Sequence, residues 1–394
     1  MASPETRRLR VLFLAERFPP QKGGVAQAAG RQVRAVATHL ARVDVLQLTS
    51  DLPPGEVVTT ALDQDQAQVH RLGRAGRDEE SLRLLHQVAC ELGRAHGHDV
   101  VHGFYAVHAG YVATLVARAL ERPSVVSLRG NDVDLGLFQG SRSAFLRFTL
   151  EQADLLLAVS TSLAEWVRVA CGRRDGVIYA PNAVDSTVFT PATSSTPGPG
   201  AMEPHARPWI GFSGELRFKK GLPVLLRLAE DRAARGSGTV FALGGARTDE
   251  RQALTSWRQR VPQASKHLVE LPYEKDRTAL AALYRALDLV VFPSLWDGMP
   301  NALLEAMACG RPVLGCRTGG IADVVEDGTG GFLTGLTRLG DFPNRVEELL
   351  ARPAAEREQV AQAARARVVE HFSVDAERER LLEVYRRLAA GSGS

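Results

Sequence analysis

The sequence has 394 residues, with 48 basic and 45 acidic side chains and a formal net charge of +3 at pH 7. Its 45% hydrophobic and 24% charged residues are typical of globular proteins and exclude a disordered chain, a collagen and a coiled coil. The small, evenly spread charge argues against a nucleic-acid partner. No apolar run reaches the roughly 18 residues of a membrane span, so we expect a cytoplasmic protein.

The four cysteines give no sign of a metal centre. Cys90, Cys171, Cys309 and Cys316 are scattered, and they form neither a C-x-x-C pair nor a cluster with histidine at zinc-site spacing. We interpret them as small buried side chains in a reducing compartment, and the sequence predicts no structural metal.

Short apolar runs alternate with helical patterns along the chain, which is typical of βαβ units with a parallel sheet. The predicted strands of the first half are 11–15, 43–48, 100–102, 125–128, 155–159 and 177–179. The helical stretches among them are 27–40, 80–96, 109–119 and 143–152. In the second half the predicted strands are 209–212, 240–243, 268–270, 289–292 and 313–315. The helices that accompany these strands are 222–235, 249–260, 276–286 and 301–309.

Residues 190–208 interrupt this alternation with five prolines among Ser, Thr and Gly. We predict a linker over 191–207, between domains at 1–190 and 208–372. Both halves resemble doubly wound α/β domains, whose ligands bind beyond the carboxyl ends of the strands. We therefore expect two Rossmann-like domains that face a cleft, and a final helix over 373–390.

Several familiar catalytic motifs are absent. The sequence has no G-x-G-x-x-G after its first strand, no G-x-x-x-x-G-K-[ST], no G-x-S-x-G and no H-E-x-x-H. Dehydrogenase, P-loop kinase, serine hydrolase and zinc protease functions thereby lose their main support.

Two glycine-rich turns are candidates for anion binding. Gly23 and Gly24 lie between the first strand and the first helix, where backbone amides can approach a ligand closely; a plain tight turn is the alternative. The segment 214–221 carries Arg217, Lys219 and Lys220 at a helix start. Because cations are disfavoured there, the basic cluster indicates an anionic ligand such as a diphosphate; a solvated basic turn is the alternative.

The most informative stretch is 293–313, a buried strand followed by a glycine turn and an apolar helix. Asp297 lies in the turn and Glu305 on the second turn of the helix, so both can face one ligand. The first helical amides, of Asn301, Ala302 and Leu303, would face it as well. A carboxylate on an otherwise apolar helix needs a partner; a capping or salt-bridge role is the alternative.

At this point the sequence resembles the retaining GT-B glycosyltransferases of glycosyltransferase family four. The 297–305 block is similar to their E-x7-E region. The segment Pro181–Asp185 with Phe189 and Pro191 resembles their P-N-G-V-D…F-x-P segment. The segment Gly319–Gly328 with Gly331 and Leu333 resembles their G-G-x-x-E-x-V-x-x-G…G-x-L segment. With Gly23–Gly24, Lys220–Gly221 and Phe372–Ser373, the resemblance spans nearly the whole chain.

The resemblance implies a nucleotide-diphosphate-sugar donor, a hydroxyl acceptor, retention of anomeric configuration and a last helix that packs back on the first domain. It implies no cofactor. Arg217 and Lys220 would neutralise the diphosphate, and Glu305 would bind the ribose hydroxyls. The donor-binding residues would also include Asp297, for the transferred sugar and the phosphates, the segment after it (Gly298, Met299, Pro300, Asn301, Ala302 and Leu303), and Tyr273 at the base edge.

On the first domain, the resemblance places Gly23 and Gly24 at a phosphate or the acceptor, and His102 and His108 within reach of the acceptor; a structural role for these histidines is the alternative. Asp132-Val-Asp134 formally matches the D-x-D motif of metal-dependent transferases, but its context is wrong for that motif, so we predict no metal. Because Arg217 and Lys220 can provide the charge, none is required.

Three positions depart from the family pattern: Asp297 replaces the usual first Glu, Glu215 stands at the Arg of a common G-R-L, and Arg129 stands at the His of a frequent H-G-x-D. Arg129 therefore suggests an anionic acceptor.

The leading hypothesis is a metal-independent retaining glycosyltransferase; the alternative is a nucleotide-sugar-binding protein without turnover. The sequence leaves open the donor base and sugar, the acceptor class, the oligomeric state and docking of the Arg-rich first domain on anionic lipid.

Overall fold

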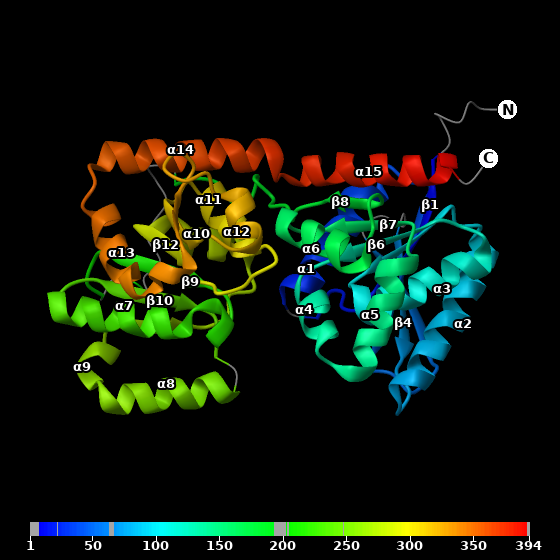
Figure 1. The fold of residues 1–394 in the computed structure, drawn as a ribbon, viewed down its shortest axis with the longest axis horizontal. Coiled ribbons are helices and arrows are strands. Elements are labelled where there is room, and N and C mark those ends of the chain that lie inside the picture. The colour runs from blue at the N-terminus through cyan, green and yellow to red at the C-terminus, as the bar shows by residue number, and fades with distance from the viewer. Residues whose placement is uncertain are drawn as a thin grey trace. The chain divides into compact units, whose positions relative to one another are not determined.

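The computed structural model describes residues 8–21, 23–62, 67–192, 202, 205–246 and 248–391, apart from the side chains of Leu135 and Ser141. It divides into two compact units, and the ribbon is drawn in Figure 1. Unit 1 runs from the N-terminus to Asn182 and takes up the chain again at Val374, whereas unit 2 holds Ala183–Ser373. Each unit is an α/β domain built on its own, mainly parallel sheet, as the sequence predicts.

Unit 1 contains an eight-stranded sheet in the order β3-β4-β2-β1-β5-β6-β7-β8. Its strands are β1 (Arg10–Ala15), β2 (Arg42–Thr49), β3 (Val57–Leu62), β4 (Ala67–Gly73), β5 (Val100–Phe104), β6 (Ser124–Leu128), β7 (Leu155–Ala158) and β8 (Val177–Tyr179). Among the described strands of this sheet, only β3 runs antiparallel to its neighbour. The pair β3 and β4 was not predicted, because β3 is exposed along most of its length and carries no apolar alternation.

Helices cover both faces of this sheet. They are α1 (Gly24–Ala37), α2 (Asp78–His96), α3 (Tyr111–Leu120), α4 (Asn131–Leu137), α5 (Gly140–Gln152), α6 (Thr161–Cys171) and α15 (Val374–Gly391), with a π-helical turn at Ala106–Gly110. One core joins α1 and α15 to the sheet through side chains such as Val33, Leu381 and Tyr385. A second core joins α2 and α3 to the opposite face through side chains such as Leu85 and Val112.

Unit 2 contains a parallel six-stranded sheet in the order β11-β10-β9-β12-β13-β14. Its strands are β9 (Trp209–Ser213), β10 (Thr239–Leu243), β11 (Leu268–Leu271), β12 (Leu289–Phe292), β13 (Val313–Cys316) and β14 (Phe332–Thr334). Its helices are α7 (Leu222–Arg235), α8 (Thr248–Arg260), α9 (Pro262–Ser265), α10 (Arg277–Ala286), α11 (Asn301–Ala308), α12 (Gly319–Val324), α13 (Phe342–Leu350) and α14 (Ala354–His371), with 3-10 turns at Phe218–Lys220 and Leu336–Asp341. Figure 1 shows α7 on one side of this sheet and α10 and α11 on the other.

The structure passes from unit 1 to unit 2 eight residues before the predicted boundary at 190. Val184 forms a parallel bridge with Ser373, and its amide donates to the Phe372 carbonyl (2.8 Å). Phe189 is fully buried, with its ring centroid 6.1 Å from that of Tyr284. These contacts attach residues 183–190 to unit 2. Most of the predicted linker, 191–207, lies outside the described residues.

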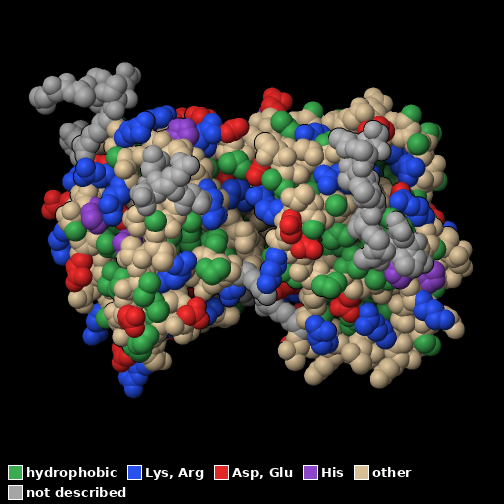
Figure 2. Space-filling view, turned by 180° about the vertical axis from the view of Figure 1, so that it is seen from behind, with side chains coloured by type: hydrophobic (Ala, Val, Ile, Leu, Met, Phe, Trp, Pro, Cys, Tyr) green, Lys and Arg blue, Asp and Glu red, His purple; other side chains and the backbone are tan. Residues whose placement is uncertain are grey.

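The order of strands reverses once in each sheet. In unit 1 the reversal lies between β1 and β5, and in unit 2 between β9 and β12. Doubly wound domains bind ligands beyond the carboxyl ends of the strands at such a reversal. No helix within the described ranges is both long enough and apolar enough to span a bilayer. On the face drawn in Figure 2, basic and acidic side chains are interspersed.

Candidate functional site

The loops after β9 and β12 of unit 2 touch at the level of the backbone. The amides of Leu295 and Trp296 both donate hydrogen bonds to the Lys219 carbonyl oxygen, with N···O distances of 2.8 and 3.4 Å. Gly221 has a φ of +85°, and a Cβ at this position would lie 2.2 Å from the Pro293 carbonyl oxygen. Glycine is therefore required at 221 both by conformation and by space, and it holds the basic turn against the Asp297 turn.

A third loop, after β13, supports the Asp297 turn from the other side. The Gly320 amide donates to the Gly298 carbonyl (2.7 Å). A Cβ on Gly319, whose φ is +45°, would lie 1.9 Å from the Asp297 carbonyl oxygen. Sequence reasoning used Gly319 and Gly320 only as part of a motif. Their close approach shows that they fix the backbone on which Asp297 stands.

Lys220 and Asp297 are brought together at this site. Lys220 Nζ lies 3.6 Å from Asp297 Oδ2, with roughly a quarter of the lysine side chain and a sixth of the aspartate side chain exposed. Arg217 lies in the same turn, and its Nη1 is 3.9 Å from Oε2 of Glu215. All three predicted catalytic residues thus stand on loops that follow the switch-point strands.

Several polar atoms of these loops are buried without a hydrogen bond. Among the described residues, Arg217 Nε, Trp296 Nε1 and Asp297 Oδ2 have no hydrogen-bond partner. Because buried polar groups of a protein are nearly always hydrogen-bonded, such atoms at one edge of a sheet indicate a site prepared for a polar ligand. Sequence analysis did not select Trp296, because no pattern distinguishes its side chain from the apolar residues around it.

Helix α11 begins at Asn301, directly after the Asp297 turn, and its N-cap Pro300 provides no side-chain cap. The predicted set of ligand-facing amides needs one correction. The Leu303 amide already donates to the Pro300 carbonyl (3.1 Å), and its side chain is fully buried. Leu303 therefore packs the helix onto the domain, and its amide is not open to a ligand.

Glu305 finds its partner in a residue that sequence reasoning missed. The Tyr284 hydroxyl donates to Glu305 Oε2 (3.0 Å), and Ser213 Oγ at the end of β9 lies 2.8 Å from the same hydroxyl. Burial, followed by the Glu305 charge, raises the pKa of Tyr284 well above its ordinary value, so it remains a donor. Tyr284 lies on the apolar face of α10, and no local pattern distinguishes it from a core residue.

Tyr273, the residue predicted at the base edge of the donor, lies at the carboxyl edge of the same sheet. It follows β11, and 52% of the residue is exposed. Burial raises the pKa of its hydroxyl, and the Glu305 charge raises it further. An exposed aromatic side chain therefore stands at the carboxyl edge of the sheet, where the Glu305 charge influences it.

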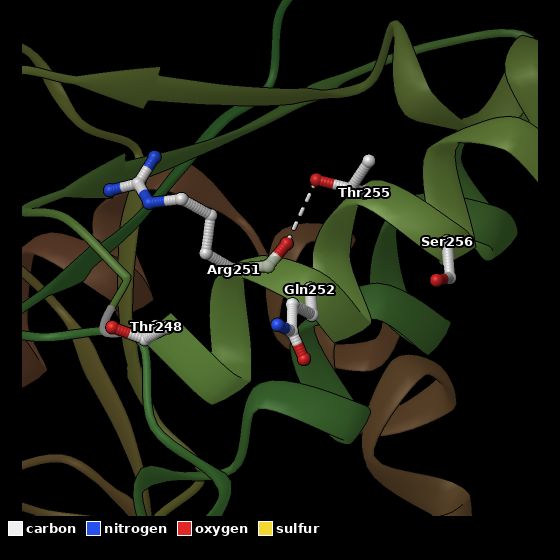
Figure 3. A pocket seen from close by; sticks show the side chains of 5 residues that line it. All are labelled: Thr248, Arg251, Gln252, Thr255 and Ser256. Atoms are coloured by element: carbon white, nitrogen blue, oxygen red, sulfur yellow. Dashed lines mark hydrogen bonds between the residues drawn. The ribbon is translucent and has the colours of Figure 1, made fainter.

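A shallow pocket lies elsewhere in unit 2, on one face of α8 (Figure 3). It is lined by Thr248, Arg251, Gln252, Thr255 and Ser256. Arg251 Nη2 donates to the Ala246 carbonyl (3.0 Å), and the Thr255 hydroxyl donates to the Arg251 carbonyl (2.9 Å). This pocket lies on one face of a single helix and contains none of the predicted site residues. The candidate site therefore remains at the loops that follow β9 and β12.

The switch point of unit 1 carries a second group of polar residues. His108 Nδ1 lies 3.1 Å from Oε1 of Glu16, which directly follows β1. Tyr105, directly after β5, has a φ of +91°, a conformation that non-glycine residues adopt rarely and often at functional sites. Gly23, with a φ of +111°, is the N-cap of α1. Glu16 and Tyr105 were not predicted, although both come directly after buried strands.

Arg129 directly follows β6 of the same sheet. Its amide donates to Asp132 at Oδ1 (2.9 Å) and Oδ2 (3.1 Å), and Asp132 Oδ2 also accepts from the Ala106 amide (2.9 Å). Asp132 is 1% exposed. Its hydrogen bonds to the amides of Ala106 and Arg129 join the loops that follow β5 and β6. Among the residues that the structure describes, no group of three or more His, Cys, Asp or Glu side chains could hold a metal ion.

Comparison with known proteins identifies the family. Residues 23–183 match the model of the glycosyl transferase 4-like domain, and residues 207–352 match the model of glycosyl transferases group 1. A GDP-mannose-dependent alpha-mannosyltransferase of Mycolicibacterium smegmatis is 30% identical over 82% of this chain and 84% of its own. The chain is a group 1 glycosyltransferase.

Other relatives agree with this assignment. A D-inositol 3-phosphate glycosyltransferase of Nocardiopsis dassonvillei is 28% identical over 85% of each chain. The sucrose-phosphate synthase of Thermosynechococcus elongatus superposes with a TM-score of 0.79 at 19% identity, over 98% of this chain and 100% of that one. Anabaena HepE, described in complex with UDP-glucose, has a TM-score of 0.78 at 19% identity, over 96% and 100%. The glycosyltransferase thus has the GT-B fold that the sequence predicts.

His102 needs a correction. In this glycosyltransferase it lies inside β5, fully buried, and not in a loop that could reach an acceptor. Its Nδ1 lies 2.7 Å from the Tyr385 hydroxyl and its Nε2 2.9 Å from Ser127 Oγ. Burial, followed by the Arg129 charge, lowers the pKa of His102 to about 3, so the ring is neutral. His102 joins α15 to the sheet of unit 1.

We predict that His102→Leu destabilises unit 1, because it leaves the buried hydroxyls of Tyr385 and Ser127 without their partner. The expected loss in the free energy of unfolding is about 3 kcal/mol, measured by urea denaturation. His39→Leu, at an exposed position of the same unit, serves as the control and should change the value by less than about 0.5 kcal/mol. Equal stability of the His102→Leu variant and the wild type would contradict the structural role.

Proposed function

We propose that this glycosyltransferase transfers a sugar from a nucleotide-diphosphate sugar to a hydroxyl acceptor, with retention of anomeric configuration and without a divalent metal. The observation that carries the proposal is the convergence of Arg217, Lys220, Asp297 and Glu305 at the switch point of unit 2. The likeness to HepE, which is described with UDP-glucose, supports the same class of donor.

The chemistry needs positive charge where the leaving group forms. Cleavage of the anomeric bond leaves a developing cationic sugar and an anionic nucleotide diphosphate. Arg217 and Lys220 lie with Lys219 in the β9 loop, and Arg217 and Lys220 would neutralise the diphosphate as its charge develops. Since they provide the charge that a metal ion provides in other transferases, the proposed reaction needs no metal.

The remaining residues would position the donor. Asp297 and the backbone from Gly298 to Ala302 would hold the transferred sugar and the phosphates, and the N-terminus of α11 favours a negative charge nearby. Glu305, oriented by Tyr284, would accept from the ribose hydroxyls. Tyr273 would lie against the base. Gly23 and Gly24 would contact the phosphate or the acceptor.

Docking of the Arg-rich first domain on anionic lipid and a cytoplasmic location of the protein stay predictions.

A nucleotide-sugar-binding protein without turnover is the second candidate. It is favoured by Glu215, whose carboxylate lies 3.9 Å from Arg217 and reduces the charge that Arg217 offers to a phosphate. Incubation with UDP-, GDP- and ADP-sugars separates the two candidates. A transferase releases the nucleoside diphosphate slowly even without acceptor, whereas a pure binding protein gains thermal stability with the donor and releases nothing. The anomeric coupling constant of the product in proton NMR then tests retention.

We predict that Lys220→Ala lowers kcat/KM by roughly two to three orders of magnitude, because the variant loses a charge that acts on the leaving group. Steady-state kinetics with the active donor measure the effect. Lys266→Ala removes an exposed lysine of the same unit and serves as the matched control. Unchanged kcat/KM in Lys220→Ala would remove Lys220 from the mechanism.

We predict that Glu305→Gln weakens donor binding by roughly 10- to 100-fold, because a neutral amide replaces an ionised acceptor for the ribose hydroxyls. Isothermal titration with the nucleoside diphosphate measures Kd. Glu370→Gln, on an exposed part of α14, is the control. An unaltered Kd in Glu305→Gln would reject the proposed ribose contact.

A further inference from the structure

Two arginine side chains of unit 1 donate to one neutral oxygen. Arg129, after β6, donates through Nη2 to Oδ1 of Asn182. Arg31, on α1, donates through its own Nη2 to the same oxygen at 3.3 Å. Asn182 is 6% exposed and follows β8. Two cationic groups therefore lie close together at a buried amide, which brings no negative charge of its own.

The charge of Arg31 is balanced within the protein. Its Nε lies 2.7 Å from Glu377 Oε2 and its Nη2 3.0 Å from Glu377 Oε1. Gln32 Nε2 donates to the same Oε1 at 3.1 Å, and Glu377 is only 2% exposed. Both oxygens of this carboxylate are thus occupied by α1, and Glu377 is directed at Arg31.

The charge of Arg129 is not balanced in the same way. Its neighbouring carboxylate, Asp132, uses both oxygens for the amides of Arg129 and Ala106. Within the described ranges, no carboxylate oxygen forms an ion pair with the Arg129 guanidinium. Instead, the guanidinium stacks over the Phe104 ring, 4.9 Å from its centroid.

The electrostatic effect of this arrangement appears in the titration of Arg129. Burial lowers the pKa of Arg129 to about 10, and the Arg31 charge lowers it further, while Glu377 and Asp132 act in the opposite direction. The side chain remains protonated at neutral pH, so a largely desolvated guanidinium lies there without a carboxylate partner in the part of the chain that the structure describes. A charge in that position is costly unless a counter-ion is bound.

We infer that the Arg129 guanidinium, which shares Asn182 Oδ1 with Arg31, binds an anionic group of the acceptor substrate. This inference rests on the proposed transferase function, and it adds that the acceptor carries a phosphate or carboxylate. The planar donor fork of arginine suits the paired oxygens of either group. Arg129 follows β6, the strand beside β5, so the anion binds next to the switch point of unit 1.

The most direct test gives Arg129 an internal counter-ion. Asn182→Asp keeps the size of the side chain and places a carboxylate between the two arginines. We expect this variant to melt at or above the wild-type Tm in chloride buffer. Inorganic phosphate at about ten times its Kd should raise the Tm of the wild type by about 3 °C. We expect Asn182→Asp to lose more than half of this increase.

Two further variants locate the effect. Arg129→Gln should also lose the response to phosphate. Arg83→Gln, at an exposed position of α2, should keep it. Titration with sodium acetate at equal ionic strength shows whether a carboxylate acts like phosphate.

The outcomes are distinguishable from those of the donor assays. Equal stabilisation of Asn182→Asp, Arg129→Gln and the wild type by phosphate and by acetate would overturn the anion site, even if the donor is cleaved normally. Loss of the response in these two variants alone supports the anion site. If no donor is then cleaved, the proposed transferase function fails separately. With an active donor, glucose 6-phosphate or glucuronate should exceed glucose as acceptor in the wild type, and this advantage should vanish in Asn182→Asp.

Discussion

The candidate donor site depends on close contact between backbone segments that leaves no room for side chains. Gly221 lies against the Pro293 carbonyl, and Gly319 and Gly320 lie against the carbonyls of Asp297 and Gly298. Three loops that follow β9, β12 and β13 are thereby held as one structure. A methyl group at any of these glycines would separate the loops, and the distance between Lys220 and Asp297 would change with them. The charges of the site are therefore positioned by steric constraints of the main chain as well as by their own attraction.

The two units use the same topological position in different electrostatic ways. In unit 2, basic side chains of the β9 loop face a turn with one carboxylate, and several polar atoms there are buried without hydrogen bonds. In unit 1, Glu16 pairs with His108, while Arg129 is held by a neutral amide and an aromatic ring. Both arrangements offer polar groups to a bound anion: buried atoms without hydrogen bonds in unit 2, and in unit 1 a guanidinium that has no ion pair among the described residues. This agrees with a donor that carries a diphosphate and an acceptor that carries an anionic group.

Sequence reasoning identified the fold, and it selected the segments that the structure brings to one edge of the unit 2 sheet, because both depend on local pattern. Strand and helix periodicity predicts the two sheets, and the glycine turns mark the strand ends. It failed where the decisive contact is long-range. Nothing near Tyr284 indicates that it binds Glu305, and only the packing of α15 shows that His102 contacts Tyr385. The amide of Leu303 was counted as open because the 3-10 hydrogen bond to Pro300 cannot be seen in the sequence.

The pairing of Arg129 with Asn182 is of the same kind. The sequence marks Arg129 as a departure from a familiar motif, but 53 residues separate it from its partner. Whether such a residue is neutralised depends on which strands are neighbours and on how the other carboxylates are used. The structure provides this information, and it turns an unusual residue into a specific hypothesis about the acceptor.

A crystal structure of the protein soaked with UDP, GDP or ADP would test the central claim most directly. The account predicts the diphosphate at the β9 and β12 loops, with oxygens within hydrogen-bond distance of Lys220 and Arg217 and the ribose hydroxyls at Glu305. A diphosphate bound away from Lys220, or a ribose that does not contact Glu305, would contradict it.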